Sequence, residues 1–97
     1  MKLLTKEIEA KLPPLYSTEE TPNSDKIAIV KFFTPRSNWT WYATEYDPTQ
    51  RLFFGLVDGF ERELGYFSLD ELESIRGGLG LRVERDRYFK PLKLKHL

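Results

Sequence analysis

Four segments rich in aromatic and β-branched residues lie between residues 27 and 67, and only short turns separate them. They cover residues 27–34, 39–46, 51–57 and 60–67. A period of two in such segments predicts β-strands. The turns carry Pro35, Pro48 and Gly59, residues that set or tolerate the dihedral angles a tight turn needs. Because short connections join neighbouring strands, we predict a four-stranded antiparallel meander.

The last turn gives a testable register. A two-residue turn at Asp58-Gly59 would place Val57 opposite Phe60 and Phe53 opposite Leu64, which makes one apolar face. The other face would mix apolar with acidic side chains, so we expect it to be covered only in part.

Helical patterns flank the meander. Residues 4–12 predict a short helix capped by Thr5 and ended by two prolines. Residues 69–76 predict a second helix, with Ser68 and Glu71 as a capping box and Gly77 as its stop. A fifth strand is expected at 81–84, and residues 90–97 read as an edge strand or a frayed basic tail. The predicted fold is one α+β domain spanning residues 1–97, a four- to five-stranded antiparallel meander packed with two short helices.

Composition excludes several classes of protein. The 97 residues carry 15 basic and 15 acidic side chains, so a net charge of zero disfavours strong nonspecific attraction to DNA or anionic membranes. The absence of cysteine excludes disulfides, thiolate nucleophiles and cysteine metal sites, and it fits a reducing, cytoplasmic location. No apolar stretch approaches the roughly 20 residues of a membrane span. The charge is uneven, since residues 82–97 hold six basic and two acidic groups.

No catalytic constellation is evident, and we predict neither a catalytic residue nor a cofactor. The single histidine, His96, lies near the end of the sequence, where side chains are seldom held in place. The glycines at 77–80 follow a helix and lack the spacing of a phosphate-binding loop. Glu61 and Glu63, two apart on a predicted strand, could serve a small metal-dependent hydrolase with a nearby aspartate. We interpret them instead as solubilising residues and assign no metal ligand.

Aromatic residues make up 14% of the chain, and they occupy both odd and even positions of the predicted strands, so they should lie on both faces of the sheet. Two short helices cannot cover every large ring, so some should be exposed, although a small core built from large side chains is the competing interpretation. Exposed apolar patches mark partner surfaces. We therefore predict a non-enzymatic module that binds a protein through an aromatic sheet face, and a homodimer would satisfy the same pattern. The predicted face comprises Trp39, Trp41, Tyr42 and Tyr66.

Single-stranded nucleic acid is the alternative partner, because bases stack on aromatic rings while cations follow the phosphates. The candidate cations are Arg36, Arg51, Arg62, Lys93 and Lys95. Glu45, Glu61 and Glu63 lie in the same region and would repel phosphate, so a protein partner fits the mixed charge better.

Several runs along the chain form a distinctive pattern. They are KFFTP at residues 31–35, SNWTWY at 37–42, TEYDP at 44–48, LFFGLV at 52–57 and GFERE at 59–63. Together they resemble the bacterial family named domain of unknown function 2958. Its members are short proteins often carried by plasmids, integrative elements and phage. The resemblance implies an accessory role on a mobile genetic element, in replication, transfer or evasion of host defence, and it assigns no functional residue.

Overall fold

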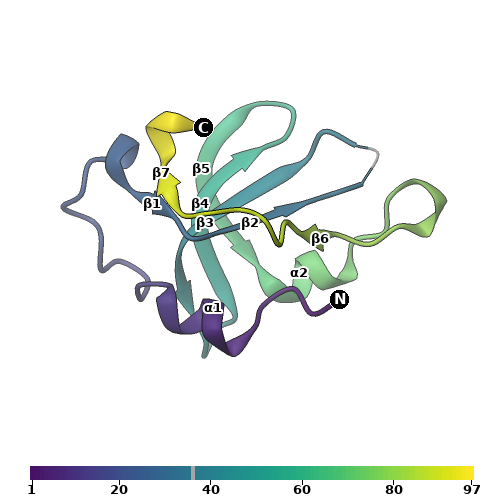
Figure 1. The fold of residues 1–97 in the computed structure, drawn as a ribbon, viewed down its shortest axis with the longest axis horizontal. Helices are drawn as coiled ribbons and strands as arrows, with labels where there is room; N and C mark the ends of the chain where they lie inside the picture. The colour runs from purple at the N-terminus through teal and green to yellow at the C-terminus, as the bar shows by residue number, and fades with distance from the viewer. Residues whose placement is uncertain (36) are drawn as a thin grey trace.

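The computed structural model describes residues 1–35 and 37–97. Its centre is a five-stranded antiparallel sheet in the order β5-β4-β3-β2-β6, accompanied by a two-stranded sheet and short helices, so the α+β class is confirmed (Figure 1). The elements are α1 (Lys6–Lys11), η1 (Asn23–Asp25), β1 (Ile27–Ala28), β2 (Val30–Phe33), β3 (Thr40–Asp47), β4 (Leu52–Asp58), β5 (Arg62–Ser68), α2 (Leu69–Ser74), η2 (Gly78–Gly80), β6 (Glu84–Arg85), β7 (Leu92–Lys93) and η3 (Leu94–His96), with η denoting a 3-10 helix.

Both predicted helices are present, and Thr5 and Ser68 are their N-caps as expected. The Thr5 hydroxyl accepts the Ile8 backbone N–H at 3.2 Å, and the Ser68 hydroxyl accepts the Glu71 N–H at 2.9 Å. Each helix is shorter than predicted. In particular α2 ends before Ile75, whose extended backbone closes it, so Gly77 is not its stop.

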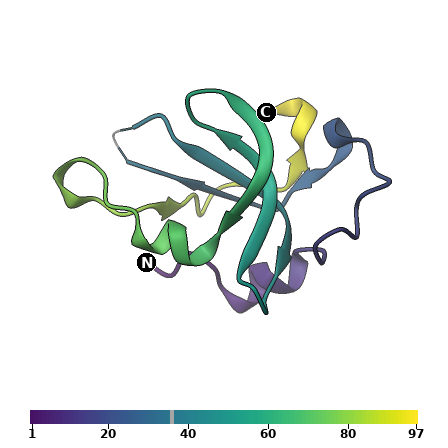
Figure 2. The ribbon, with the colours of Figure 1, turned by 180° about the vertical axis from the view of Figure 1, so that it is seen from behind.

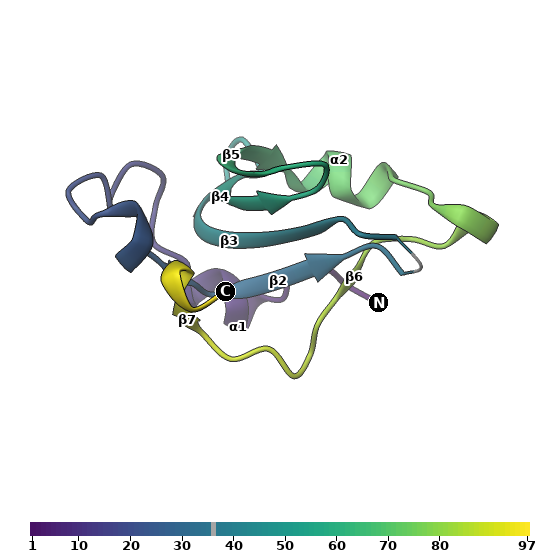
Figure 3. The ribbon, with the colours of Figure 1, turned by 90° about the horizontal axis from the view of Figure 1, so that it is seen from above.

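The sheet is strongly curved, and Figure 3 shows β5, β4, β3 and β2 stacked in that order. The predicted strand 27–34 is interrupted at Ile29 and forms two strands. The later piece, β2, pairs with β3 inside the sheet, whereas β1 pairs with β7 from the far end of the chain. The fifth strand of the sheet is Glu84–Arg85, slightly later than predicted, and it pairs with β2.

One face of the sheet, the helix face, packs against α1 with its flanking leucines and against α2. Phe32 and Phe53 are fully buried there, with ring centroids 5.4 Å apart. Burial of apolar area on this scale is the main favourable term in folding. The buried members of this core are Leu3, Leu4, Leu12, Val30, Phe32, Trp41, Ala43, Tyr46, Phe53, Phe67, Leu69, Leu72 and Val83.

The opposite face, the tail face, is covered by the C-terminal segment. Ala28, Leu56 and Leu94 are buried in a second cluster, which Phe89 and Leu97 join. The backbone N–H of Leu94 also donates to the Lys26 carbonyl at 2.9 Å. Residues 90–97 are therefore a docked strand and 3-10 turn, and of the two expectations for this segment the frayed tail was wrong.

The register of the β4–β5 hairpin differs from the prediction. Asp58 pairs with Arg62 and Phe53 with Phe67, so three residues, Gly59 to Glu61, form the loop. The predicted pairs Val57–Phe60 and Phe53–Leu64 were wrong. The observed register is favoured because it places Phe67 beside Phe53 in the core, with ring centroids 5.2 Å apart.

A β-bulge in β3 sets which side chains face which layer. The register shifts between Ala43 and Glu45, which leaves Thr44 as the extra residue, and its hydroxyl donates to the Phe54 carbonyl at 3.1 Å. Because a bulge inverts the alternation after it, Tyr46 joins the helix-face core and Glu45 turns to the tail face.

Candidate functional site

The four predicted aromatic residues do not form one surface. Trp41 is only 6% exposed and belongs to the helix-face core. Trp39 lies on the same side, at the end of the sheet. Tyr42 faces the other way and packs against Phe89, with ring centroids 5.9 Å apart. Tyr66 is 53% exposed and lies next to Tyr16. The structure thus places Trp39 and Trp41 on the helix face and places Tyr42 and Tyr66 on the tail face.

Trp39 is the centre of an aromatic corner at the tip of the β4–β5 hairpin. Its ring stacks on the Trp41 ring with centroids 5.9 Å apart. It meets the Phe60 ring nearly at right angles, with centroids 5.3 Å apart. Phe60 is 95% exposed. Gly59 lies directly against the Trp39 ring, since an added Cβ would come within 2.3 Å of it. A side chain at Gly59 would therefore displace the indole, and this turn holds Trp39 in place.

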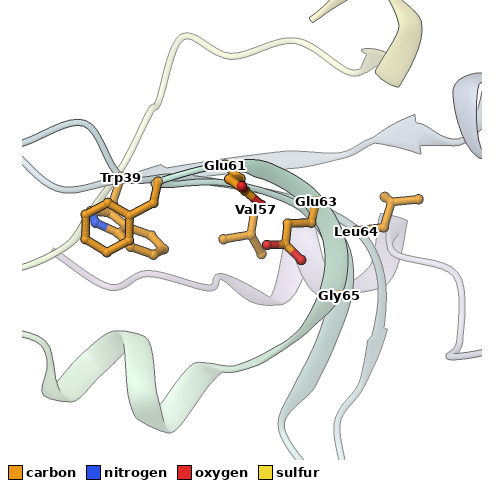
Figure 4. Close-up of a pocket in the computed structure, with 7 residues that line it drawn as sticks. Trp39, Val57, Glu61, Glu63, Leu64 and Gly65 are labelled. Carbon is orange, nitrogen blue, oxygen red and sulfur yellow. The ribbon is translucent and has the colours of Figure 1, made fainter.

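A pocket of about 320 Å³ opens beside this corner. Figure 4 shows Val57 between the Trp39 ring and the Glu63 carboxylate, with Glu61 above it. We call it the Trp39 pocket. It is lined by Trp39, Val57, Phe60, Glu61, Glu63, Leu64 and Gly65.

Gly65 helps to keep the pocket open. It lies opposite Gly55 in the sheet, and a Cβ built on Gly65 meets nothing within 4 Å. A glycine inside a strand weakens the strand, so its presence often marks a bulge or a place that something else approaches. Here the missing side chain leaves the end of the helix face bare, beyond the reach of the two helices.

The charge that the described residues give the pocket is negative. Among them, the titratable side chains that line it are the carboxylates of Glu61 and Glu63. Neither forms an ion pair with any of the described residues. An aromatic wall beside two carboxylates is suited to a long side chain that ends in a cation.

The pocket adjoins an open sheet edge. β5 is the outermost strand of the five-stranded sheet, and no other strand among the described residues pairs with its outer side (Figure 2). Its seven residues include the pocket residues Glu63, Leu64 and Gly65. Unpaired backbone N–H and C=O groups along such an edge are a template for another strand.

A second hollow, of about 180 Å³, lies on the tail face between Tyr16 and Tyr66. Partial burial raises the pKa of the Tyr66 hydroxyl above its usual 10.0, and the neighbouring Tyr16 hydroxyl adds to the effect. Beneath the hollow lies a buried ion pair, with the Lys26 ammonium 4.0 Å from the Glu45 carboxylate. The exposed rings here are a second aromatic patch.

The Glu45–Lys26 pair holds a loop in place through hydrogen bonds to Tyr16 and Thr18. We call this set of bonds the loop clasp. The Glu45 carboxylate accepts the backbone N–H groups of Tyr16 and Thr18, at 2.9 and 3.2 Å, and also the Thr18 hydroxyl. The Lys26 ammonium donates to the Thr18 carbonyl and hydroxyl. These bonds hold the loop before η1 against the tail face.

The described cations predicted to contact nucleic acid all have acidic partners. Arg51 pairs with Asp70 and Glu73 at 2.8 Å each. Arg62 pairs with Asp58 at 3.4 Å and donates to the Leu97 carbonyl at 3.0 Å. Lys93 and Lys95 both pair with Asp25, at 3.8 and 3.1 Å. Arg36 lies outside the described residues. These four cations would have to leave their partners to bind phosphate.

The predicted carboxylate pair is arranged differently from the expectation of one strand face. Glu61 belongs to the hairpin loop and Glu63 to β5, although both line the Trp39 pocket. Among residues 1–35 and 37–97, no group of three or more His, Asp or Glu side chains could hold a metal ion. His96 is exposed in η3.

Sequence reasoning missed three residues of these sites. Gly65 carried a usable signal, because an isolated glycine inside a strand pattern points to a bulge or a close approach. Phe60 is not singled out because Asp58-Gly59 predicts a two-residue turn, which puts Phe60 inside a strand. Tyr16 gave no signal, since its position depends on the loop clasp.

A family model described as "Protein of unknown function (DUF2958)" matches residues 3–94. No curated protein and no solved structure matches the chain. No helix among the described residues is long and apolar enough to cross a membrane.

Proposed function

The chain belongs to the DUF2958 family, whose function is unknown, and we propose that it is a non-enzymatic module that binds a protein partner. The binding surface is the Trp39 pocket together with the adjoining edge of β5. One observation carries this proposal: a bare aromatic pocket lies directly beside an unpaired strand edge.

Two independent features of that surface support protein binding. Aromatic side chains in pockets dominate the energetics of interfaces, and Phe60 and Trp39 form such a group. Proteins usually shorten, cover or charge their sheet edges to prevent pairing. Here the edge strand is seven residues long, and it borders a pocket that could select what pairs with it.

The wider setting follows from the family resemblance. We place the protein in the cytoplasm, as an accessory factor of a mobile genetic element such as a plasmid. Its partner would then be a protein of replication, of transfer or of host defence.

Single-stranded nucleic acid is the less favoured partner. Its phosphates would have to compete with Asp25, Asp58, Asp70 and Glu73 for the candidate cations. A metal-dependent hydrolase centred on Glu61 and Glu63 is less favoured too, because no third carboxylate of the described residues lines the pocket.

The test compares two pocket variants with a matched control. Phe60→Ser removes the exposed ring of the pocket, and Gly65→Val fills the open space. Tyr88→Ser removes a ring that is equally accessible, at 87% exposure, and does not line the pocket. Thermal unfolding by circular dichroism verifies that all three variants are folded.

The readout is affinity capture from a lysate of the cells that carry the gene, with and without nuclease, quantified by mass spectrometry. We expect one protein to be captured by the wild type and by Tyr88→Ser, and to be lost from Phe60→Ser and Gly65→Val. Equal capture by all four forms would contradict the proposal. So would binding that nuclease abolishes.

A further inference from the structure

We propose that the partner's docking segment is an extended strand that pairs with the outer edge of β5 and inserts an arginine side chain into the Trp39 pocket. This inference rests on the proposed function and names the chemistry of its partner.

The edge determines the backbone conformation of the segment. An extended peptide adds to an exposed sheet edge through main-chain hydrogen bonds, while pockets for alternate side chains supply specificity. β5 offers seven residues and one adjoining pocket on its helix-face side. A helical partner would leave the edge N–H and C=O groups unpaired.

The distance across the sheet requires a long side chain. An added strand lies about 4.8 Å beyond β5, and β4 lies about the same distance on its other side. A side chain from the added strand must therefore be long enough to pass across β5 and enter the pocket beside Val57. The path is open at Gly65, because no described residue apart from its chain neighbours comes within 4 Å of the position its Cβ would occupy.

The charge of the pocket requires a cation at the end of that side chain. Glu61 and Glu63 are the charged groups of the pocket, and neither has an ion-pair partner among the described residues. Arginine is favoured over lysine because its planar guanidinium can donate bidentate hydrogen bonds to carboxylates and can also stack on aromatic rings. The exposed Phe60 ring is available for that packing.

The same charge disfavours a second copy of this chain as the occupant. Pairing β5 with β5 would add a second Glu61 and Glu63 to the joined edge, while the one cation that β5 carries, Arg62, already pairs with Asp58 and donates to the Leu97 carbonyl. The partner is thus a different polypeptide with a basic extended segment.

The probe is a displayed library of cyclic hairpin peptides, each presenting one randomised outward strand. The library is selected on the immobilised full-length protein. The affinity of each selected peptide is then measured for four forms of the protein, namely wild type, Gly65→Val, the Glu61→Gln/Glu63→Gln double variant and the control Tyr88→Ser. Hydrogen exchange of the β5 amides reports whether the edge becomes paired.

We expect selected strands to share an arginine at one position and to bind wild type and Tyr88→Ser equally. Replacing that arginine by norleucine, or both carboxylates by amides, should weaken binding at least about tenfold, the order expected for a charge-assisted hydrogen bond. Gly65→Val should abolish binding, and exchange of the β5 amides should slow in the complex.

Other outcomes overturn the inference in distinguishable ways. Binders that lose affinity for Gly65→Val yet lack arginine enrichment, or bind the amide variant equally well, would refute the arginine and leave the protein-binding function standing. Binders indifferent to Gly65→Val would refute both the pocket and the function proposed for it. Failure to select any binder would refute strand addition at this edge.

Discussion

Two glycines that face each other across β4 and β5 meet opposite requirements. A Cβ on Gly55 would lie 1.8 Å from the Tyr42 carbonyl oxygen, so the backbone of β3 demands glycine there. A Cβ on Gly65 would meet nothing within 4 Å. The first glycine is required by the fold, whereas the second leaves room for a ligand.

We predict that Gly55→Ala lowers the free energy of unfolding by about 3 kcal/mol or more, because overpacking against backbone cannot be relieved by a rotamer change. Gly65→Ala should instead raise it by about 0.5–1 kcal/mol, since alanine loses less conformational entropy in a strand. Urea denaturation measures both. Equal costs at the two positions would contradict the close packing of Gly55 against the backbone of β3.

At the scale of elements, the buried Glu45–Lys26 ion pair fixes the position of the long loop before η1. Glu45 is 3% exposed and Lys26 is 5% exposed, and their hydrogen bonds converge on Tyr16 and Thr18. The bulge at Thr44 is what turns Glu45 toward that loop. A local irregularity in β3 therefore positions a segment almost thirty residues earlier in the chain.

We predict that Glu45→Leu costs about 3–5 kcal/mol of stability, because it leaves a buried ammonium without its counter-charge and two backbone N–H groups without an acceptor. Lys26→Met should cost less, since the Glu45 carboxylate keeps its donors from Tyr16 and Thr18. The double variant should cost less than the sum of the single changes. Denaturant titration of the wild type and the three variants completes a double-mutant cycle. Strict additivity of the changes in unfolding free energy would argue against a coupled pair.

The sequence predicts the elements of this fold and the order of its meander well, whereas it predicts the register of the β4–β5 hairpin and the burial of individual rings poorly. Alternation in residues 39–46 and the capping box at Ser68 are local signals, so the strands and helices were found. The hairpin register was wrong because Asp58-Gly59 has the chemistry of a two-residue turn, while tertiary packing of Phe67 on Phe53 and of Trp39 on Gly59 favours three. For the same reason Trp41 could not be separated from Trp39, since its burial depends on the helices opposite.

On the scale of the whole molecule, the C-terminal segment joins distant parts of the chain. β7 pairs with β1, and Lys93 and Lys95 both reach Asp25 in η1. The hydrogen bond and charge of Lys95, aided by the charge of Lys93, lower the pKa of Asp25 below its usual 3.8. The stabilisation from this group is therefore present above about pH 3.8 and is lost as the pH falls through the lowered pKa.

We predict that Asp25→Asn lowers the melting temperature at pH 7 and that the difference from wild type shrinks in acid, disappearing below the lowered pKa. The contacts are exposed, so the effect at pH 7 should also shrink in high salt. Paired melting curves at pH 7 and in strong acid test this. A difference that persists in acid would mean that Asp25 acts through something other than its charge.

The pairing of β1 with β7 has a kinetic consequence. The meander from β2 to β5 forms through neighbours in sequence, whereas β1 and β7 meet only after the chain has closed a loop over most of its length. Contacts that close such long loops are costly to form early, so they should be absent from the folding transition state. Substitutions in β7 should therefore accelerate unfolding and leave the folding rate nearly unchanged, which stopped-flow chevron plots would measure. The last strand would then govern how long the folded molecule persists, while the meander governs how quickly it forms.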